Sequence, residues 1–447
     1  MSQSLFARSL PVVALTFVDV LGLTIILPLL HLYAIQYDAT PLQIGLTAAA
    51  FPLAQLIGVP VMGALSDRYG RKPLLLISQI TTCIGFLMLA AATSLEMVLL
   101  SRIFDGLFGA NLATAQAAIT DLTDEKTRAQ GLGLTGAAFG AGFLIGPAIA
   151  LIALDFSKGL AMPALIAAAY SFVSILITFF GFKETLPPEK RGAPGHGAMR
   201  SLFTAGRMLR RPSVNALLIL MFAQQFVFFA FESLLGLFLL NRLGLLGQGS
   251  ALVFIYVGVI LIAVQVRLIG RWTRKYGEAR VMRLALTALG IGLLLVAATP
   301  AQPHPFYVEA LTRYELRDLQ PNATERVIGG IPVELPDETA RGFGGILWLA
   351  LAAVPLTVGA GLIRPTLNSL MVGRVGGGER GAILGVSASM VSLADASAPL
   401  VGGWLFQAYG STMPFALGGA ALLILAALSL LIVRKAGRGD SRSSRPR

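Results

Sequence analysis

Twelve long runs of mostly apolar residues dominate this sequence and restrict the folds open to it. A helix of about 20 residues crosses the hydrocarbon core of a bilayer, which is about 30 Å thick. The runs cover residues 10–33, 42–65, 74–93, 96–119, 130–153, 161–182, 213–240, 250–269, 281–299, 345–371, 381–405 and 412–433. Backbone groups in lipid must hydrogen-bond within their own segment, and the alternating pattern of a membrane barrel is absent. The sequence therefore predicts an all-α membrane protein with twelve transmembrane helices.

The composition agrees with a membrane protein. Of the 447 residues, 55% are hydrophobic and 13% are charged, whereas soluble domains carry about a quarter charged residues. The first run is too long for a signal peptide and has Asp19 near its middle, so we expect a retained helix. The single Cys83 has no disulfide partner in the chain.

The net charge of +12 follows from topology. With the N-terminus inside, most Lys and Arg fall in the segments that face the cytoplasm. The largest of these are residues 66–73, 183–212, 270–283 and the tail from residue 434. The positive-inside rule then places both termini in the cytoplasm. We expect a multi-pass protein of the plasma membrane, or of the inner membrane in bacteria, with the lipid bilayer as its surroundings and no nucleic-acid partner.

A Pro-rich, Gly-rich and charged segment, residues 183–212, separates two six-span halves. The halves echo each other, since GALSDRYGRKP at 63–73 aligns with GRWTRKYGEAR at 270–280. We expect two pseudo-symmetric six-helix bundles with the site between them, as in many transporters. The predicted division is an N-terminal bundle, a cytoplasmic linker, a C-terminal bundle and a basic cytoplasmic tail, at residues 1–182, 183–212, 213–434 and 435–447.

One outer loop, residues 300–344, is unusually long and carries seven acids and four Arg. Its stretch FYVEALTRYELRDL is suited to a surface helix. The loop could be a lid, a docking site or decoration. Asn322 begins a glycosylation sequon that matters only in a eukaryotic secretory route.

Six charged residues lie inside predicted spans, where each costs about 2.5–3.5 kcal/mol on insertion scales. They are Asp19, Arg102, Asp105, Glu232, Arg364 and Asp395. Arg102 and Asp105 are three apart and can pair on one helix face, and such a pair could simply fix helix packing. The other three carboxyls have no neutralising neighbour in sequence, so each must face water, a partner helix or substrate, or carry a proton. A carboxyl that binds a proton in one conformation and releases it in another suits a proton-coupled carrier. Arg364 lies nearer the cytoplasmic end of its span. Its side chain could simply extend to the membrane interface without a role in the site.

Other motifs give weaker signals. GLGLTG at 131–136 fits a dinucleotide fingerprint but begins a membrane helix, which excludes that interpretation. The same helix has Gly142 and Gly146 at a spacing that permits close helix approach, and Pro147 permits a bend. His31 lies at the outer end of span one, while His196 and His304 are in loops. None of the three indicates a metal site or a proton relay at the membrane centre, and we expect no cofactor.

Several motifs resemble the major facilitator superfamily. GALSDRYGRKP matches its signature between helices two and three, and SRIFDGLFGA at 101–110 resembles its helix-four pattern. GFLIGPAIA at 142–150 resembles the antiporter signature of helix five, with Ala150 in place of the last glycine. DVLGLTIILP at 19–28 resembles helix one of twelve-span drug/proton antiporters, including tetracycline-type efflux pumps.

This resemblance implies roles for individual residues. Asp67 and Arg71 would form a cytoplasmic charge cluster with Asp121, and Asp67 would face the N-terminal end of span eleven. With Gly63, Arg68 and Gly70, the cluster would latch the two bundles in the outward-open state and break on switching. The alternative is that the charges only anchor the span ends. Asp19, Arg102 and Asp105 would serve proton coupling, and Asp19, Glu232, Asp395 and Arg364 would line the substrate cavity. Gly142, Gly146 and Pro147 would shape the bend in span five.

We therefore expect a secondary active transporter with rocker-switch alternating access. It would act as a monomer and export small amphipathic, cationic or zwitterionic compounds against inward protons, with the proton gradient as its only driving force. The alternatives are a lipid, glycolipid or metabolite carrier of the same fold, or a non-transporting sensor. An intramembrane enzyme is disfavoured because neither H-E-x-x-H nor G-x-S-x-G occurs.

Overall fold

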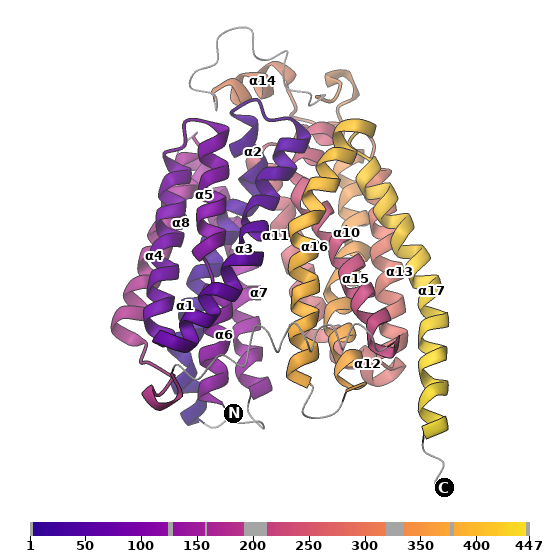
Figure 1. Cartoon of the computed structure of the whole chain (residues 1–447). Coiled ribbons are helices and arrows are strands. Elements are labelled where there is room, and N and C mark those ends of the chain that lie inside the picture. Colours follow the sequence, from indigo (N-terminus) through magenta and orange to yellow (C-terminus); the bar gives the residue numbers. More distant parts are fainter. Residues whose placement is uncertain are drawn as a thin grey trace.

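The computed structural model describes residues 3–123, 128–156, 159–191, 212–318, 335–375 and 380–443, and within these ranges the chain is helical and has no strand (Figure 1). The all-α membrane fold is thus confirmed. The N-terminal half contains α1 (Gln3–Ile26), α2 (Leu30–Ile35), α3 (Pro41–Tyr69), α4 (Arg71–Ala90), α5 (Leu95–Phe108), α6 (Asn111–Leu122), α7 (Arg128–Phe156) and α8 (Ala161–Leu176). The C-terminal half contains α10 (Pro212–Leu243), α11 (Gly247–Ala263), α12 (Ile269–Tyr276), α13 (Glu278–Ala297), α14 (Glu309–Asp318), α15 (Gly344–Val372), α16 (Arg380–Tyr409) and α17 (Met413–Ser443).

The helices are consistent with twelve spans. Among the described residues, nine segments are long and apolar enough to cross a membrane. The three other expected spans correspond to α5 with α6, to α7 and to α17, whose apolar stretches are shorter. The bundle boundaries proposed from the sequence stay a prediction, because residues 192–211 of the linker lie outside the described ranges.

Several spans are interrupted, which hydropathy did not indicate. A short 3-10 turn, Leu27–Leu29, separates α1 from α2, and α5 ends just before Gly109. Ser78 of α4 repairs the second break, since its hydroxyl donates to the carbonyl of Phe108 (2.6 Å) and accepts from the amide of Ala110 (2.7 Å). A side chain that satisfies freed backbone groups makes a broken helix tolerable inside a membrane.

The bundle has two distinguishable ends. One carries the α3–α4 turn with Asp67, and we call it the Asp67 end. The opposite end carries α14, and we call it the α14 end (Figure 1). At this end α3 begins with a capping box, in which the amide of Gln43 donates to the hydroxyl of Thr40 (3.3 Å) while the Gln43 side chain accepts from the Thr40 amide (2.8 Å).

The two halves meet closely at the α14 end. Between α3 and α16, the Cα of Gly45 faces the carbonyl of Pro399, and a Cβ built on Gly403 would lie 2.6 Å from the carbonyl of Pro41. The amide of Leu42 donates to the side chain of Gln407 (3.2 Å). The contacts of Gly45, Gly403 and Leu42 across the two halves all lie at this end. The structure is therefore closed at the α14 end.

The loop between α13 and α15 contains the surface helix expected from the sequence, as α14. It is held to the end of α10, because the amide of His304 donates to the carbonyl of Leu243 (3.1 Å) and the buried ring of Tyr307 lies against Gly244. Gly244 has φ of +65°, and its Cα is so close to the Tyr307 ring that no side chain fits there. Asn322 lies outside the described residues.

Candidate functional site

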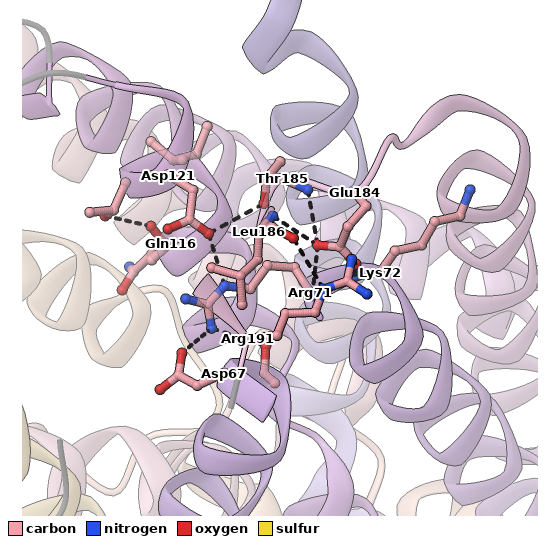
Figure 2. A network of polar contacts seen from close by, with 12 residues as sticks. Asp67, Arg71, Lys72, Gln116, Asp121, Glu184, Thr185, Leu186 and Arg191 are labelled. Atoms are coloured by element: carbon pink, nitrogen blue, oxygen red, sulfur yellow. Dashed lines mark hydrogen bonds and ion pairs between the residues drawn. The ribbon is translucent and has the colours of Figure 1, made fainter. Parts of the chain in front are cut away.

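The predicted charge cluster forms at the α3–α4 turn (Figure 2). The guanidinium of Arg71 donates from Nη1 to Asp67 Oδ1 at 2.6 Å and from Nε to Asp121 Oδ2 at 2.9 Å. Asp67 is on α3 and Asp121 near the end of α6, so one Arg side chain ties three helices together. Arg71 also donates to the hydroxyl of buried Ser66 (3.1 Å). The structure thus brings together Asp67, Arg71 and Asp121, as the resemblance implies.

A residue that the sequence did not indicate completes this cluster. Glu184 follows the last turn of the sixth span, and its carboxylate accepts from the amides of Arg71 (2.9 Å) and Lys72 (3.1 Å) at the start of α4. The amides of Thr185 and Leu186 donate to the same carboxylate (3.0 Å each), and Arg191 lies 3.6 Å away. A carboxylate at a helix N-terminus satisfies orphan amides and complements the helix dipole.

The environment of Glu184 favours its ionised form. Partial burial opposes ionisation, but the donated amides of Leu186, Arg71 and Lys72 and the charge of Arg191 outweigh it and lower the pKa of this carboxyl. Thr185 extends the network, since its hydroxyl donates to Asp121 Oδ2 (3.3 Å). The segment after the sixth span is therefore bonded to both sides of the Arg71 cluster (Figure 2).

The other predicted gating residues differ in their surroundings. Gly70 has φ of +109°, and a side chain there would collide with the Glu184 carboxylate, so the turn requires glycine. A Cβ on Gly63 would meet no atom within 4 Å. Arg68 is exposed and lies over the ring of Tyr69, with 5.4 Å from its guanidinium carbon to the ring centroid. In the described residues, therefore, neither a side chain at Gly63 nor the guanidinium of Arg68 is bonded to the cluster.

The latch role of the cluster stays a prediction. All its bonds lie within the N-terminal half, while the α14 end is closed. The Arg71 ion pairs are thus present in a state that is closed at the α14 end. Only a contact from Asp67, whose side chain is 51% exposed, to the start of α16 could break on switching.

A second polar group lies buried within the N-terminal half. Asp19 of α1 sits beside Gln79 and Ser174, which bond to each other at 2.8 Å. Both carboxylate oxygens of Asp19 are buried and have no hydrogen-bond partner. Asp105 lies within electrostatic range of Asp19. An unpartnered buried carboxyl must carry a proton or await a ligand.

The pair predicted on α5 is present. Arg102 Nη1 lies 3.7 Å from Asp105 Oδ2, and both side chains are 3% exposed. Thr82 of α4 donates to Asp105 Oδ1 (2.8 Å), and the Arg102 guanidinium carbon lies 5.4 Å from the centroid of the Phe86 ring. Arg102 Nη2 has no partner among the described residues. Arg102 thus has a free donor beside the Asp105 carboxylate.

The C-terminal half holds the other carboxyls. Gln225 of α10 donates to Asp395 Oδ1 of α16 (2.8 Å), and Arg364 of α15 lies within electrostatic range of Asp395. Glu232 is on α10, near enough to Asp395 to interact electrostatically, and the structure shows it no hydrogen bond. Asp19 and Glu232 therefore lie on the first helix of their respective halves and lack the partners that Asp105 and Asp395 have.

The predicted small-residue contact in α7 is also present. Gly142 lies against Val20 of α1, Gly146 lies against Thr24, and the Thr24 hydroxyl donates to the carbonyl of Gly142 (2.9 Å). Pro147 is buried inside α7. These contacts bring α7 close to the helix that carries Asp19.

Two residues of interest were missed or misplaced by sequence reasoning. The sequence holds one weak signal for the role of Glu184: it is an acidic residue that directly follows a span, in a basic segment. His31 was interpreted as peripheral, but it is 4% exposed and lies against Gly236 of α10, between the halves. Its position at a span end could not distinguish an exposed residue from one at a junction.

Solved structures with this fold are transporters. The chain superposes on the human organic anion transporter MFSD10 (TETRAN) with a TM-score of 0.65 at 22% identity, covering 95% of this chain and 99% of that one. For the nucleoside transporter NupG the TM-score is 0.66 at 14% identity, covering 98% and 100%. At these identities the likeness shows the fold alone.

The sequence is similar to curated resistance proteins. It is 24% identical over 429 residues to Multidrug resistance protein 2 of Bacillus subtilis (strain 168), covering 95% of this chain and 94% of that one. It is 26% identical over 426 residues to the class C tetracycline resistance protein of Escherichia coli, covering 94% of both. The family model described as Major Facilitator Superfamily matches residues 12–311. The apolar helices, the Arg71 cluster and these matches together show that the chain is a multi-pass membrane transporter that belongs to the major facilitator superfamily.

Proposed function

We propose that this transporter exports small amphipathic compounds, cationic or zwitterionic, in exchange for protons. The observation that carries the proposal is the pair of unpartnered carboxyls, Asp19 and Glu232, one in each half. Asp105 and Asp395 each have a hydrogen-bond donor and an Arg within electrostatic range. An uncompensated carboxyl inside each half suits a cation, or a proton in its place.

Exchange follows if substrate and protons compete for the same carboxyls. A proton that neutralises Asp19 or Glu232 removes the charge that would hold a cationic substrate. Release of that proton on the other side of the membrane restores the negative charge of the carboxyl. A gradient of one pH unit supplies about 1.4 kcal/mol per proton, so transport against a substrate gradient needs only this competition and alternating access.

The structure and the charge distribution support a direction of transport, from the cytoplasm outward. The α14 end is closed by contacts of α3 with α16 and of α10 with α2. The positive-inside rule assigns the opposite end, with its basic loops, to the cytoplasm. We infer an inward-facing state, ready to take substrate from the cytoplasm or inner leaflet. The relatives named for multidrug and tetracycline resistance support export as the net direction.

The test is uptake into proteoliposomes across an imposed pH gradient. The probes are a small panel of lipophilic cations, a tetracycline and a fluorescent lipid. Movement of a drug-like compound that depends on the gradient and stops with a protonophore supports the proposal. Movement of the lipid alone would contradict the proposal and indicate a lipid carrier. No flux with any probe would favour a sensor.

A further inference from the structure

His31 lies at the closest approach between the first helix region of one half and the first helix of the other. It is on α2, which continues α1 beyond the Leu27–Leu29 turn. Its imidazole packs against the α10 backbone at Gly236, where a built Cβ would overlap Cε1 and both ring nitrogens. The side chain is 4% exposed. The α14 end therefore closes directly onto this ring.

The imidazole has no polar partner in this state. Its Nε2 is buried without a hydrogen bond, and the described residues show none to Nδ1. A protonated imidazole has two N–H donors and a charge, and burying these without acceptors is costly. The closed junction therefore favours the neutral ring over the charged one, because Nε2 is buried without an acceptor.

The charged residues near His31 do not compensate for a positive charge on its ring. α2 packs against the Leu27–Leu29 turn, α3, α5 and α10. The 3-10 turn and the first 26 residues of α3, Pro41–Ser66, carry no charged residue. On α5, Glu96 is exposed and Arg102 pairs with Asp105. On α10, Arg242 donates to the carbonyl of Thr299 (2.7 Å), and no ion pair joins Glu232 to His31 in the described structure. On α2 itself, the Tyr33 hydroxyl donates to the carbonyl of Leu160 (2.5 Å).

We propose that His31 is a proton-binding site that controls the α14 end. Proton uptake from that side opens the junction, and loss of the proton allows it to close. The imidazole is suited to this role because it changes charge near physiological pH, and because opening would expose it to water. The proposal deepens the proposed function, since it adds a second proton step to the exchange.

The position of Glu232 links this site to the proposed substrate carboxyls. Glu232 lies four residues before Gly236, so both are on one face of α10. Movement of α10 away from His31 would carry Glu232 with it. The state of the junction and the surroundings of the carboxyl are thereby coupled through one rigid helix.

The test measures opening directly and needs no transport. Spin labels are placed on Thr93→Cys, before α5, and Tyr409→Cys, at the end of α16, in a Cys83→Ser background. Both sites are exposed, and they lie on opposite halves at the α14 end. Distance distributions are recorded in detergent and in lipid nanodiscs from pH 8 to pH 5, without substrate.

The wild-type distribution is expected to shift to longer distances as the pH falls. His31→Gln, which stays neutral, is expected to keep the short distance throughout. His304→Gln is the matched control, a second histidine at the same end, and is expected to shift like the wild type. His31→Arg, permanently charged, is expected to show the long distance even at pH 8.

Two results would overturn the proposal: a wild-type distribution that does not change with pH, or an acid shift that persists in His31→Gln. If His31→Arg does not fold, the comparison of wild type with His31→Gln still tests whether His31 controls opening. Because no flux is measured, failure of proton-coupled export would leave this result standing, and the reverse also holds.

Discussion

The carboxylate of Glu184 accepts the first backbone amide of α4, that of Arg71, at 2.9 Å, and so joins the segment after the sixth span to the start of the third. Arg71 in turn binds Asp67 and Asp121. The bonds connect residues 113 positions apart and hold the α3–α4 turn in place. Removing Glu184 should therefore loosen the turn without touching any ion pair of Arg71.

We predict that Glu184→Ala lowers the free energy of unfolding by about 0.5–2 kcal/mol, the usual effect of losing a helix cap. Glu184→Gln keeps one acceptor oxygen and should lose less. Thermal unfolding of the purified protein measures both. Glu189→Ala, an exposed acid in the same segment, is the control and should match the wild type. Equal losses from Glu184→Ala and Glu189→Ala would show that the cap has no effect.

Glu184 also predicts a pH dependence. Its pKa in the folded protein is lowered, so ionised Glu184 stabilises the fold above the ordinary pKa of a glutamate, about 4.3. This contribution should disappear as the pH falls through the lowered folded-state pKa. The difference in unfolding temperature between wild type and Glu184→Gln should be largest near pH 6 and shrink in acid. A difference that grows in acid would contradict the assignment.

The two motif glycines should respond differently to a methyl group. Gly70→Ala forces a non-glycine residue to φ of +109° beside the Glu184 carboxylate, a strain of about 1–3 kcal/mol. Gly63 is in a helix with open space around it, so Gly63→Ala should be neutral or stabilising by up to about 1 kcal/mol. Thermal unfolding compares the two variants. Loss of transport in a stable Gly63→Ala would mean that another conformation requires Gly63.

The two aspartates of the cluster allow stability and gating to be separated. The Asp121 side chain is 19% exposed and that of Asp67 is 51% exposed. Asp121→Asn should cost about 1–3 kcal/mol of stability, because it weakens a partly buried bond to a charged group, and Asp67→Asn at most about 1 kcal/mol. If Asp67 acts as a gate, its variant should nevertheless lose most of the transport rate. A fully active Asp67→Asn protein would leave the cluster with an anchoring role alone.

Glycines of α16 provide a test of closure at the α14 end. Gly403 approaches the backbone of Pro41, whereas Gly385 on the same helix has no atom within reach of a Cβ. A side chain forced into a packed contact costs about 1–3 kcal/mol, so Gly403→Leu should increase the open population about 5- to 150-fold. Labelling of Ala49→Cys, which is buried in this state and lies one turn after Gly45 on the α16-facing side of α3, by an impermeant thiol reagent in a Cys83→Ser background reports the change. Gly385→Leu should label like the parent, and unchanged labelling in Gly403→Leu would show that this contact does not limit opening.

Much of the fold follows from the sequence, because lipid leaves a chain few choices. The length of each apolar run and the distribution of basic residues were enough to predict helical spans. The motif around Asp67 was specific enough to predict its pairing through Arg71 with Asp121. The spacing of Arg102 and Asp105 likewise predicted their contact.

Other features depend on contacts that no local pattern records. The break after Phe108 is stabilised by Ser78, 30 residues earlier. Glu184 caps a helix that begins more than 100 residues before it. His31 looks peripheral in sequence because hydropathy gives the depth of a residue along a span but not the direction in which it faces. The junction between the halves therefore had to be found in the structure.

The central claim is that Asp19 and Glu232 couple substrate export to protons. The most direct test is drug transport in proteoliposomes by Asp19→Asn and Glu232→Gln, with and without a pH gradient, beside the wild type. The account predicts that both variants lose the acceleration by the gradient while they remain folded and inserted. Retention of full gradient-driven transport by both variants would contradict it and place the proton sites elsewhere.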